Sequence, residues 1–154
     1  MGALCQRMTE DLKLKNYASN TQRAYLRCAR HFAAFHMRSP TEMGEPQIRD
    51  FLLSLTLRKA SPQTLAIHIA SLRFLYATTL RRPEEVVALA WPKIPRHLPD
   101  ILSGSEVEVL LAAVEPLVVR GVIMTTYGAG LRIQEACSLQ TGDIDAKRML
   151  IHVR

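Results

Sequence analysis

The sequence has few cysteines and no long apolar run, and each shortage argues against a class of protein. Its three cysteines, Cys5, Cys28 and Cys137, lie far apart, which argues against a disulfide framework and against a CxxC metal site. No stretch approaches the roughly 18 apolar residues of a membrane span, and the start lacks the apolar run of a secretory signal. We therefore expect a cytoplasmic, soluble protein with reduced thiols, no bound metal and no membrane partner.

The chain is nevertheless long and apolar enough to bury a core. It has 154 residues, of which 48% are hydrophobic. Domains commonly hold about 100 to 150 residues, so this length suits one domain and part of another. A complete two-domain enzyme does not fit comfortably.

Positive charge is concentrated in the front of the chain. The formal net charge is +6 and the sequence pI is about 9.6. Residues 1–97 carry 15 Lys and Arg against 7 Asp and Glu, whereas residues 98–154 carry 5 against 7. Arginine outnumbers lysine 15 to 5, and its planar guanidinium suits bidentate contact with phosphate or guanine. Nucleic acid is therefore the leading candidate partner.

Apolar residues recur at helical spacing over residues 1–80 and predict a bundle of four helices. The first carries Leu4, Met8 and Leu12; the second, from Thr21 to about Met37, carries Tyr25, Ala29, Phe32 and Phe35; the third carries Ile48, Phe51, Leu52 and Leu55; and the fourth, to about Leu80, carries Leu65, Ile69, Leu72 and Tyr76. We expect Ser19 or Asn20 to cap the second helix and Ser61 the fourth, and Pro46 to open the third.

Prolines interrupt the helical pattern over residues 81–99, which we interpret as a linker with one short turn near Glu84. A second unit, residues 100–154, begins at an N-cap, Ser103 or Ser105. Further helices are expected near 118–127 and 131–139, and a strand near 149–153. A single terminal strand has no partner, so the pattern predicts that this unit is an incomplete domain. The fold class is mainly α.

Basic residues recur along one face of the second helix. Arg23, Arg27, Arg30 and His31 lie opposite its apolar stripe. Such a face can lie against a phosphate backbone or enter the major groove, which is wide enough for a helix. The alternative is a solvated helix face that binds nothing.

The fourth helix carries a second polar stripe. Its candidates for DNA contact are Gln63, Thr64, His68, Ser71 and Arg73. Short hydroxyl and amide groups allow close approach to DNA. The alternative is that these residues merely face water.

The segment Tyr127 to Leu139 is the sharpest local motif. Glycines before Arg132 would let a phosphate approach backbone donors beside a fixed positive charge. No Gly-Lys-Ser/Thr follows, which argues against a nucleotide-binding P-loop. The alternative reading is a glycine C-cap at a helix end and a surface ion pair from Arg132 to Glu135.

Gly130-Leu131-Arg132-x-x-Glu135, with Leu139 and Asp143-Ile144-Asp145, resembles the first arginine box of tyrosine recombinases of the phage integrase type. Upstream, Ser19-x-Thr21-x-x-x-Tyr25, Ser61-x-x-Thr64 and Leu72-Arg73-x-x-Tyr76 resemble that family's SAM-like core-binding domain, and Leu98-Pro99 with Leu102-Ser103 resembles the entry to its catalytic domain. The resemblance thus implies a SAM-like DNA-binding domain at 1–80, a linker at 81–99 and the incomplete start of an α+β catalytic domain at 100–154.

The resemblance further implies strand exchange on duplex DNA through a 3′-phosphotyrosyl intermediate, without a metal or nucleotide cofactor. Arg132 matches an arginine that binds the scissile phosphate, and Glu135 matches an acidic position that supports the local structure. Ala129 and Gln134 depart from the residues common in that box. All four tyrosines precede Arg132, and no second histidine and arginine box is present. We therefore expect this chain to bind DNA and not to cleave it alone.

Two other readings remain open at this point. The chain could be a non-catalytic DNA-binding protein that occupies recombination sites or pairs with a full-length recombinase. It could instead be a helical protein-interaction module whose basic charge is incidental. Self-association is also possible, because an incomplete second unit would expose apolar surface.

Overall fold

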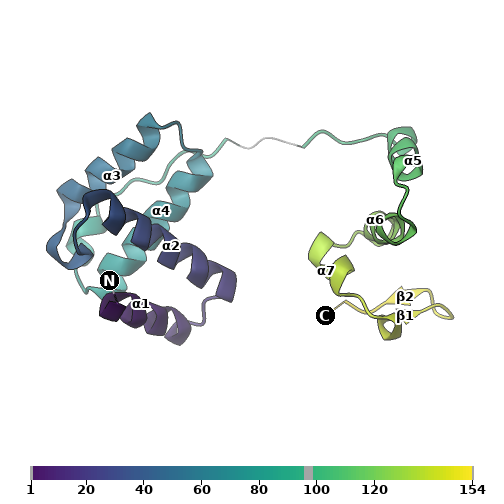
Figure 1. The fold of residues 1–154 in the computed structure, drawn as a ribbon, viewed down its shortest axis with the longest axis horizontal. Coiled ribbons are helices and arrows are strands. Elements are labelled where there is room, and N and C mark those ends of the chain that lie inside the picture. Colours follow the sequence, from purple (N-terminus) through teal and green to yellow (C-terminus); the bar gives the residue numbers. More distant parts are fainter. Residues whose placement is uncertain (1, 96–98, 154) are drawn as a thin grey trace. The chain divides into compact units, whose positions relative to one another are not determined.

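The computed structural model describes residues 2–95 and 99–153 and is mainly α, as the sequence pattern predicts (Figure 1). The chain divides into two compact units, which we call unit 1, Met1–Arg96, and unit 2, His97–Arg154. Residues 96–98 of the expected linker, including Leu98, lie outside the described residues. Each unit is considered by itself below.

Unit 1 is a bundle of four α-helices with short additional turns (Figure 1). Its elements are α1 (Gly2–Leu14), α2 (Ser19–His36), the 3₁₀ turn η1 (Pro40–Glu42), α3 (Glu45–Leu57), α4 (Pro62–Phe74), the π-helical turn η2 (Leu75–Thr79) and the 3₁₀ turn η3 (Pro83–Val86). The four predicted helices are confirmed. The fourth was expected to run to about Leu80, and its last turn is π-helical, a form that the apolar spacing did not indicate.

Local side-chain chemistry explains some helix ends and not others. The Ser61 hydroxyl accepts a hydrogen bond from the Thr64 backbone N–H at 3.1 Å and caps α4, as predicted. The expected cap on α2 is wrong, because Ser19 already lies inside the helix and Ala18 occupies the N-cap without a side-chain bond. Met37 ends α2 in the left-handed conformation, at φ 50°.

Aromatic rings form the centre of the unit 1 core. Phe32, Phe51 and Tyr76 are fully buried, and the Phe32 ring lies 5.4 Å from that of Phe51 and 6.3 Å from that of Tyr76. These edge-on arrangements are the ones that aromatic quadrupoles favour. The Tyr76 hydroxyl finds a partner inside the core by donating to the Pro40 carbonyl at 3.1 Å, so the π-helical turn is tied to η1.

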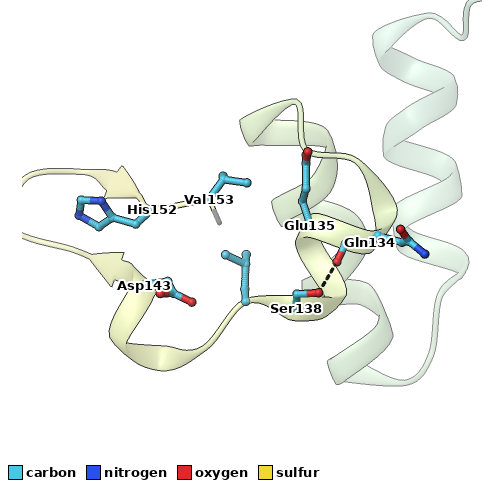
Figure 2. A pocket seen from close by; sticks show the side chains of 7 residues that line it. Gln134, Glu135, Ser138, Asp143, His152 and Val153 are labelled. Carbon is cyan, nitrogen blue, oxygen red and sulfur yellow. Dashed lines mark hydrogen bonds between the residues drawn. The ribbon is translucent and has the colours of Figure 1, made fainter. Parts of the chain in front are cut away.

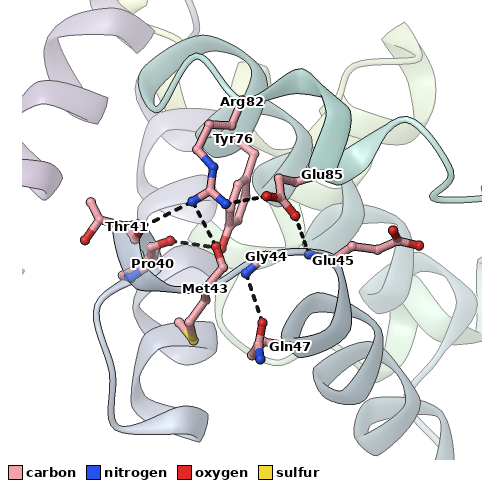
Figure 3. Close-up of polar contacts among 9 residues, drawn as sticks. All are labelled: Pro40, Thr41, Met43, Gly44, Glu45, Gln47, Tyr76, Arg82 and Glu85. Atoms are coloured by element: carbon pink, nitrogen blue, oxygen red, sulfur yellow. Dashed lines mark hydrogen bonds and ion pairs between the residues drawn. The ribbon is translucent and has the colours of Figure 1, made fainter.

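A second set of polar contacts joins the segment after η2 to η1 and to the start of α3 (Figure 3). The Arg82 guanidinium donates to the carbonyls of Thr41, at 3.2 Å, and Met43, at 3.1 Å, and it also pairs with the Glu85 carboxylate. Glu85 in turn accepts from the backbone N–H of Glu45, at 2.6 Å, in the first turn of α3. We call Arg82, Glu85 and these partners the Arg82 clasp.

The clasp shows that unit 1 extends beyond residue 80. Val86 is buried in the core, and Leu89 packs against it. The Arg73 guanidinium donates to the Leu89 carbonyl and lies 5.2 Å from the centre of the Trp91 ring. The expected start of the linker at residue 81 is therefore too early, because apolar burial and this cation–π contact hold the following segment on the bundle.

Unit 2 holds three α-helices and a two-stranded hairpin. Its elements are α5 (Gly104–Ala113), α6 (Leu117–Ala129), α7 (Ile133–Ser138), the 3₁₀ turn η4 (Thr141–Asp143), β1 (Ile144–Asp145) and β2 (Leu150–Ile151). Ser103 caps α5 by accepting from the Glu106 N–H at 3.3 Å, as the sequence predicts. The expectation that the last strand has no partner is wrong, because Leu150 and Ile151 pair antiparallel with Asp145 and Ile144.

Unit 2 buries very little of its apolar surface. Within residues 99–153, Val107 and Ala136 are the buried hydrophobic residues. Fourteen large apolar side chains in the same range are exposed, among them Leu117, Val118 and Met124 on α6. Unit 2 thus has defined helices but hardly a core of its own.

Candidate nucleic-acid interface and arginine box

The exposed face of α2 carries the predicted row of basic residues. The side chains of Arg23, Arg27, Arg30 and His31 are all exposed, while Phe32 on the opposite face is fully buried. Burial of the apolar side leaves the basic side in contact with solvent, where it can meet a ligand. We call these four residues the α2 basic face.

Contacts at both edges of the α2 basic face orient its side chains. The Arg23 guanidinium donates to the Asn20 side-chain oxygen one turn earlier, and Arg30 donates to the Cys5 sulfur of α1 at 3.3 Å. The His31 ring lies 5.3 Å from the His68 ring of α4. The neighbouring helices α1 and α4 thus hold two edges of the face, which lowers the side-chain entropy that binding must remove. The Cys5 contact joins segments 25 residues apart and had no signal in the sequence.

The structure changes the predicted polar stripe on α4. Gln63 and Thr64, in the first turn, are exposed. His68 is 6% exposed and Ser71 is fully buried, with its hydroxyl donating to the Tyr25 carbonyl of α2 at 2.8 Å. The expectation that His68 and Ser71 face DNA is therefore wrong, because α4 is packed between α2 and α3 and these residues lie in its interfaces.

Arg73 is also engaged within unit 1. Its guanidinium donates to the Leu89 carbonyl and stacks near Trp91, so the side chain is half-buried. A DNA contact would require it to leave both partners. We therefore assign Arg73 to the anchoring of the segment after η3 and no longer expect it at the interface.

His68 makes unit 1 sensitive to acid. Burial, followed by the positive charges of His31 and Arg27, lowers the pKa of His68 to about 4. The unfolded chain takes up this proton near pH 6.5, whereas the folded chain resists it until about pH 4, so stability falls as the pH drops between these values. Between pH 7 and 5, unit 1 should lose about 2 kcal/mol of unfolding free energy. Urea titrations that follow Trp91 fluorescence measure this.

A His68→Leu variant provides the control for the acid effect. It removes the titrating ring and also its Nδ1 atom, which is buried without a hydrogen-bond partner. The variant should therefore lose clearly less stability than the parent over the same pH range. An equal loss in both proteins would show that other groups cause the acid sensitivity.

The arginine box forms a helix end and a helix start. Gly130 ends α6 in the left-handed conformation, at φ 65°, which glycine adopts without strain. Arg132 follows at the N-cap of α7, with its side chain 86% exposed. The expected interruption at Gly128 is wrong, because this residue lies within α6. Both features of the alternative interpretation, the glycine C-cap and the Arg132–Glu135 ion pair, are present.

Glu135 holds Arg132 through two contacts. Its carboxylate accepts from the Arg132 backbone N–H at 2.7 Å and from the guanidinium at 3.0 Å. The backbone hydrogen bond, then the side-chain bond, lowers the pKa of Glu135 below its usual range. A carboxylate that stays ionised in this way suits positioning of the arginine better than proton transfer.

A pocket of about 240 Å³ lies between α7 and the hairpin (Figure 2). Glu135, Ser138, Asp143 and His152 contribute to its lining, and Arg132 does not. The pocket forms because the His152 N–H donates to the Asp143 carbonyl at 2.9 Å and returns the end of β2 toward α7. No pattern in the sequence predicts this pocket, since it depends on a two-residue strand pair.

Within residues 2–95 and 99–153, no three His, Cys, Asp or Glu side chains gather where they could hold a metal ion. No described helix combines the length and apolar character that crossing a membrane requires.

Comparison with known proteins relates the whole chain to integrases. The sequence model of the phage integrase N-terminal SAM-like domain matches residues 4–85. A Sinorhizobium fredii protein named as an integrase/recombinase, y4qK, is 41% identical over 157 residues, covering 99% of this chain and 50% of that protein. The tyrosine recombinase XerA of Thermococcus onnurineus is 32% identical over 145 residues, covering 93% and 50%.

These comparisons also bear on length. The chain spans about half the length of the curated relatives it matches. Among solved structures, a XerA recombinase crystal structure covers 99% of this chain and 55% of its own, at 22% identity and a TM-score of 0.49.

Proposed function

The chain belongs to the phage integrase family of tyrosine recombinases, and from this membership we propose that it binds duplex DNA through unit 1 in site-specific recombination. The α2 basic face forms the centre of the proposed contact, and Gln63 and Thr64 in the first turn of α4 extend it. These residues supply charged donors for phosphates and short polar groups for base edges.

The exposure of the α2 basic face is the observation that carries this proposal. Arg23, Arg27 and Arg30 are solvent-accessible on a helix whose other side is buried in the core. The surplus of positive charge also belongs to residues 1–97. A helix that presents cations outward has the geometry for a groove or for a phosphate backbone.

We further propose that Arg132 binds the scissile phosphate when the catalytic site is complete. Its side chain is free of the core and is oriented by Glu135, which keeps its charge in place for a developing anion. Tyr17, Tyr25, Tyr76 and Tyr127 precede it in the sequence, and Tyr76 is fully buried. Binding without strand cleavage is therefore the activity proposed for residues 1–154.

The salt dependence of binding tests the proposal. If three or more phosphates are contacted, the logarithm of the association constant should fall with the logarithm of salt concentration with a slope of about −3 or steeper. Fluorescence anisotropy of a labelled duplex between low and moderate salt measures this slope. A slope near zero would instead favour a helical protein-interaction module, whose apolar contacts respond little to salt.

A further inference from the structure

A groove of about 450 Å³ lies in unit 1 between α3, α4 and the segment that follows η3. We call it the Trp91 groove, because residues 88–92 form one of its walls and carry this ring. Pockets that bind small organic groups commonly measure roughly 300 to 1,000 Å³. No residue of the α2 basic face lines the groove, so it is a surface separate from the proposed duplex contact.

Trp91 is held in place and still presents its ring to the groove. The Arg73 guanidinium lies over the ring, 5.2 Å from its centre, and also donates to the Leu89 carbonyl. The Trp91 side chain nevertheless remains 55% exposed. With the guanidinium on one side, the exposed area of the ring is available to a second planar group. A restrained, exposed aromatic ring of this kind is a stacking platform for a nucleobase.

The α3 wall of the groove combines apolar and polar groups. Leu53 is 54% exposed beside the ring and supplies apolar surface. Arg49 and Glu45 line the same wall, and neither has an ion-pair partner among the described residues. A guanidinium suits a phosphate, and a carboxylate accepts hydrogen bonds from the N–H groups of a base. A purely aliphatic ligand would leave both charged groups unused.

We propose that the Trp91 groove binds an unpaired base of single-stranded DNA, with the base stacked on Trp91 and its adjoining phosphate on Arg49. Residues 1–97 carry 15 Lys and Arg against 7 Asp and Glu, and this surplus favours a polyanion over a neutral peptide or lipid. Duplex DNA does not fill the groove, because its bases stack on one another. The site therefore goes beyond the duplex contact on α2 and does not depend on it.

The emission of Trp91 tests base stacking directly, since it is the only tryptophan of the chain. The full chain is titrated at low salt with oligothymidylate of about 15 nucleotides, and emission should fall by roughly half or more as bases stack on the indole. An oligomer of equal length with abasic sites throughout carries the same charge and should leave the emission nearly unchanged. A duplex should bind through α2 and also leave most of the emission.

Substitutions in the groove separate the base from the phosphate. Trp91→Ala should weaken binding of a labelled oligothymidylate roughly tenfold or more, measured by anisotropy, because the stacked base loses its platform. Arg49→Gln keeps the indole and should lower the steepness of the salt slope by about 0.7, the share of one phosphate on a single strand.

A matched control places the effect in the groove rather than in the net charge. Arg58 is exposed at the end of α3 and does not line the groove. Arg58→Gln removes the same charge and should leave both the quenching and the salt slope close to those of the parent. The Arg23, Arg27 and Arg30 alanine variant should bind the oligomer more weakly and still show quenching that requires bases.

Three results would overturn the proposal. The first is unchanged Trp91 emission when anisotropy shows the oligothymidylate to be bound. The second is equal quenching by the abasic oligomer, which would assign the groove to phosphates alone. The third is an equal effect of Arg49→Gln and Arg58→Gln on the salt slope. A chain that fails to bind duplex DNA but shows base-dependent quenching would refute the duplex contact on α2 and support the groove.

Discussion

Replacing Arg23, Arg27 and Arg30 together with alanine should weaken binding to duplex DNA roughly 100-fold or more at about 0.1 M salt. Each lost phosphate contact also removes about 0.9 from the steepness of the salt slope, so the slope should flatten by nearly three. The side chains are exposed on α2, and their loss therefore leaves the unit 1 core intact. Anisotropy titrations of the two proteins at several salt concentrations measure both quantities.

A control with the same change of charge separates location from net charge. Arg7 on α1, Arg38 after α2 and Arg49 on α3 are exposed and lie outside the α2 basic face. Their joint replacement with alanine should cost less than about tenfold, through the long-range field alone. Equal losses in the two triple variants would contradict the placement of DNA on α2 and would leave binding to the overall positive charge.

The basic face of α2 was predictable because its two sides differ so strongly. Four polar or charged residues alternate with buried aromatic and aliphatic residues at helical spacing. An amphipathic helix that packs on a single core buries its apolar side, so its basic side must face solvent. The flanking contacts were not predictable. The bond from Arg30 to Cys5 depends on how α1 packs, which no local pattern encodes.

The polar stripe on α4 did not predict exposure correctly, because α4 packs against both α2 and α3. Thr64, His68 and Ser71 share a stripe in sequence, but only the first remains exposed. Ser71 is satisfied by the Tyr25 carbonyl, and a small hydroxyl with such a partner is readily buried. Polarity in the sequence thus indicates exposure only where no neighbouring helix offers an acceptor.

The residues of the arginine box were predictable from the sequence, but the pocket beside them was not. The box residues, from Gly130 to Glu135, were identified from their order, and the structure gives them a helix C-cap and a restrained guanidinium. The pocket beside α7 depends on the pairing of Ile144 with Ile151 and of Asp145 with Leu150, a strand contact two residues long. Such a short pair carries no periodicity, so the adjoining pocket could not be expected from the sequence.

Replacing Arg82 with alanine should lower the free energy of unfolding of unit 1 by about 2 to 4 kcal/mol, because one guanidinium serves three acceptors. The variant leaves the carbonyls of Thr41 and Met43 without this donor and releases Glu85, which holds the first turn of α3 (Figure 3). The melting temperature should fall by roughly 10 °C or more for a unit of this size.

The neighbouring arginine provides a matched control for the Arg82 clasp. Arg81 is exposed, and Arg81→Ala removes the same charge one residue away, so it should change the free energy of unfolding by less than about 0.5 kcal/mol. Arg82→Lys keeps the charge but cannot reach three acceptors with one ammonium group, and should fall between the two. Urea unfolding followed by Trp91 fluorescence ranks them. If Arg82→Lys matches the parent, charge alone holds the segment; if Arg82→Ala matches Arg81→Ala, core packing of Val86 holds it without the clasp.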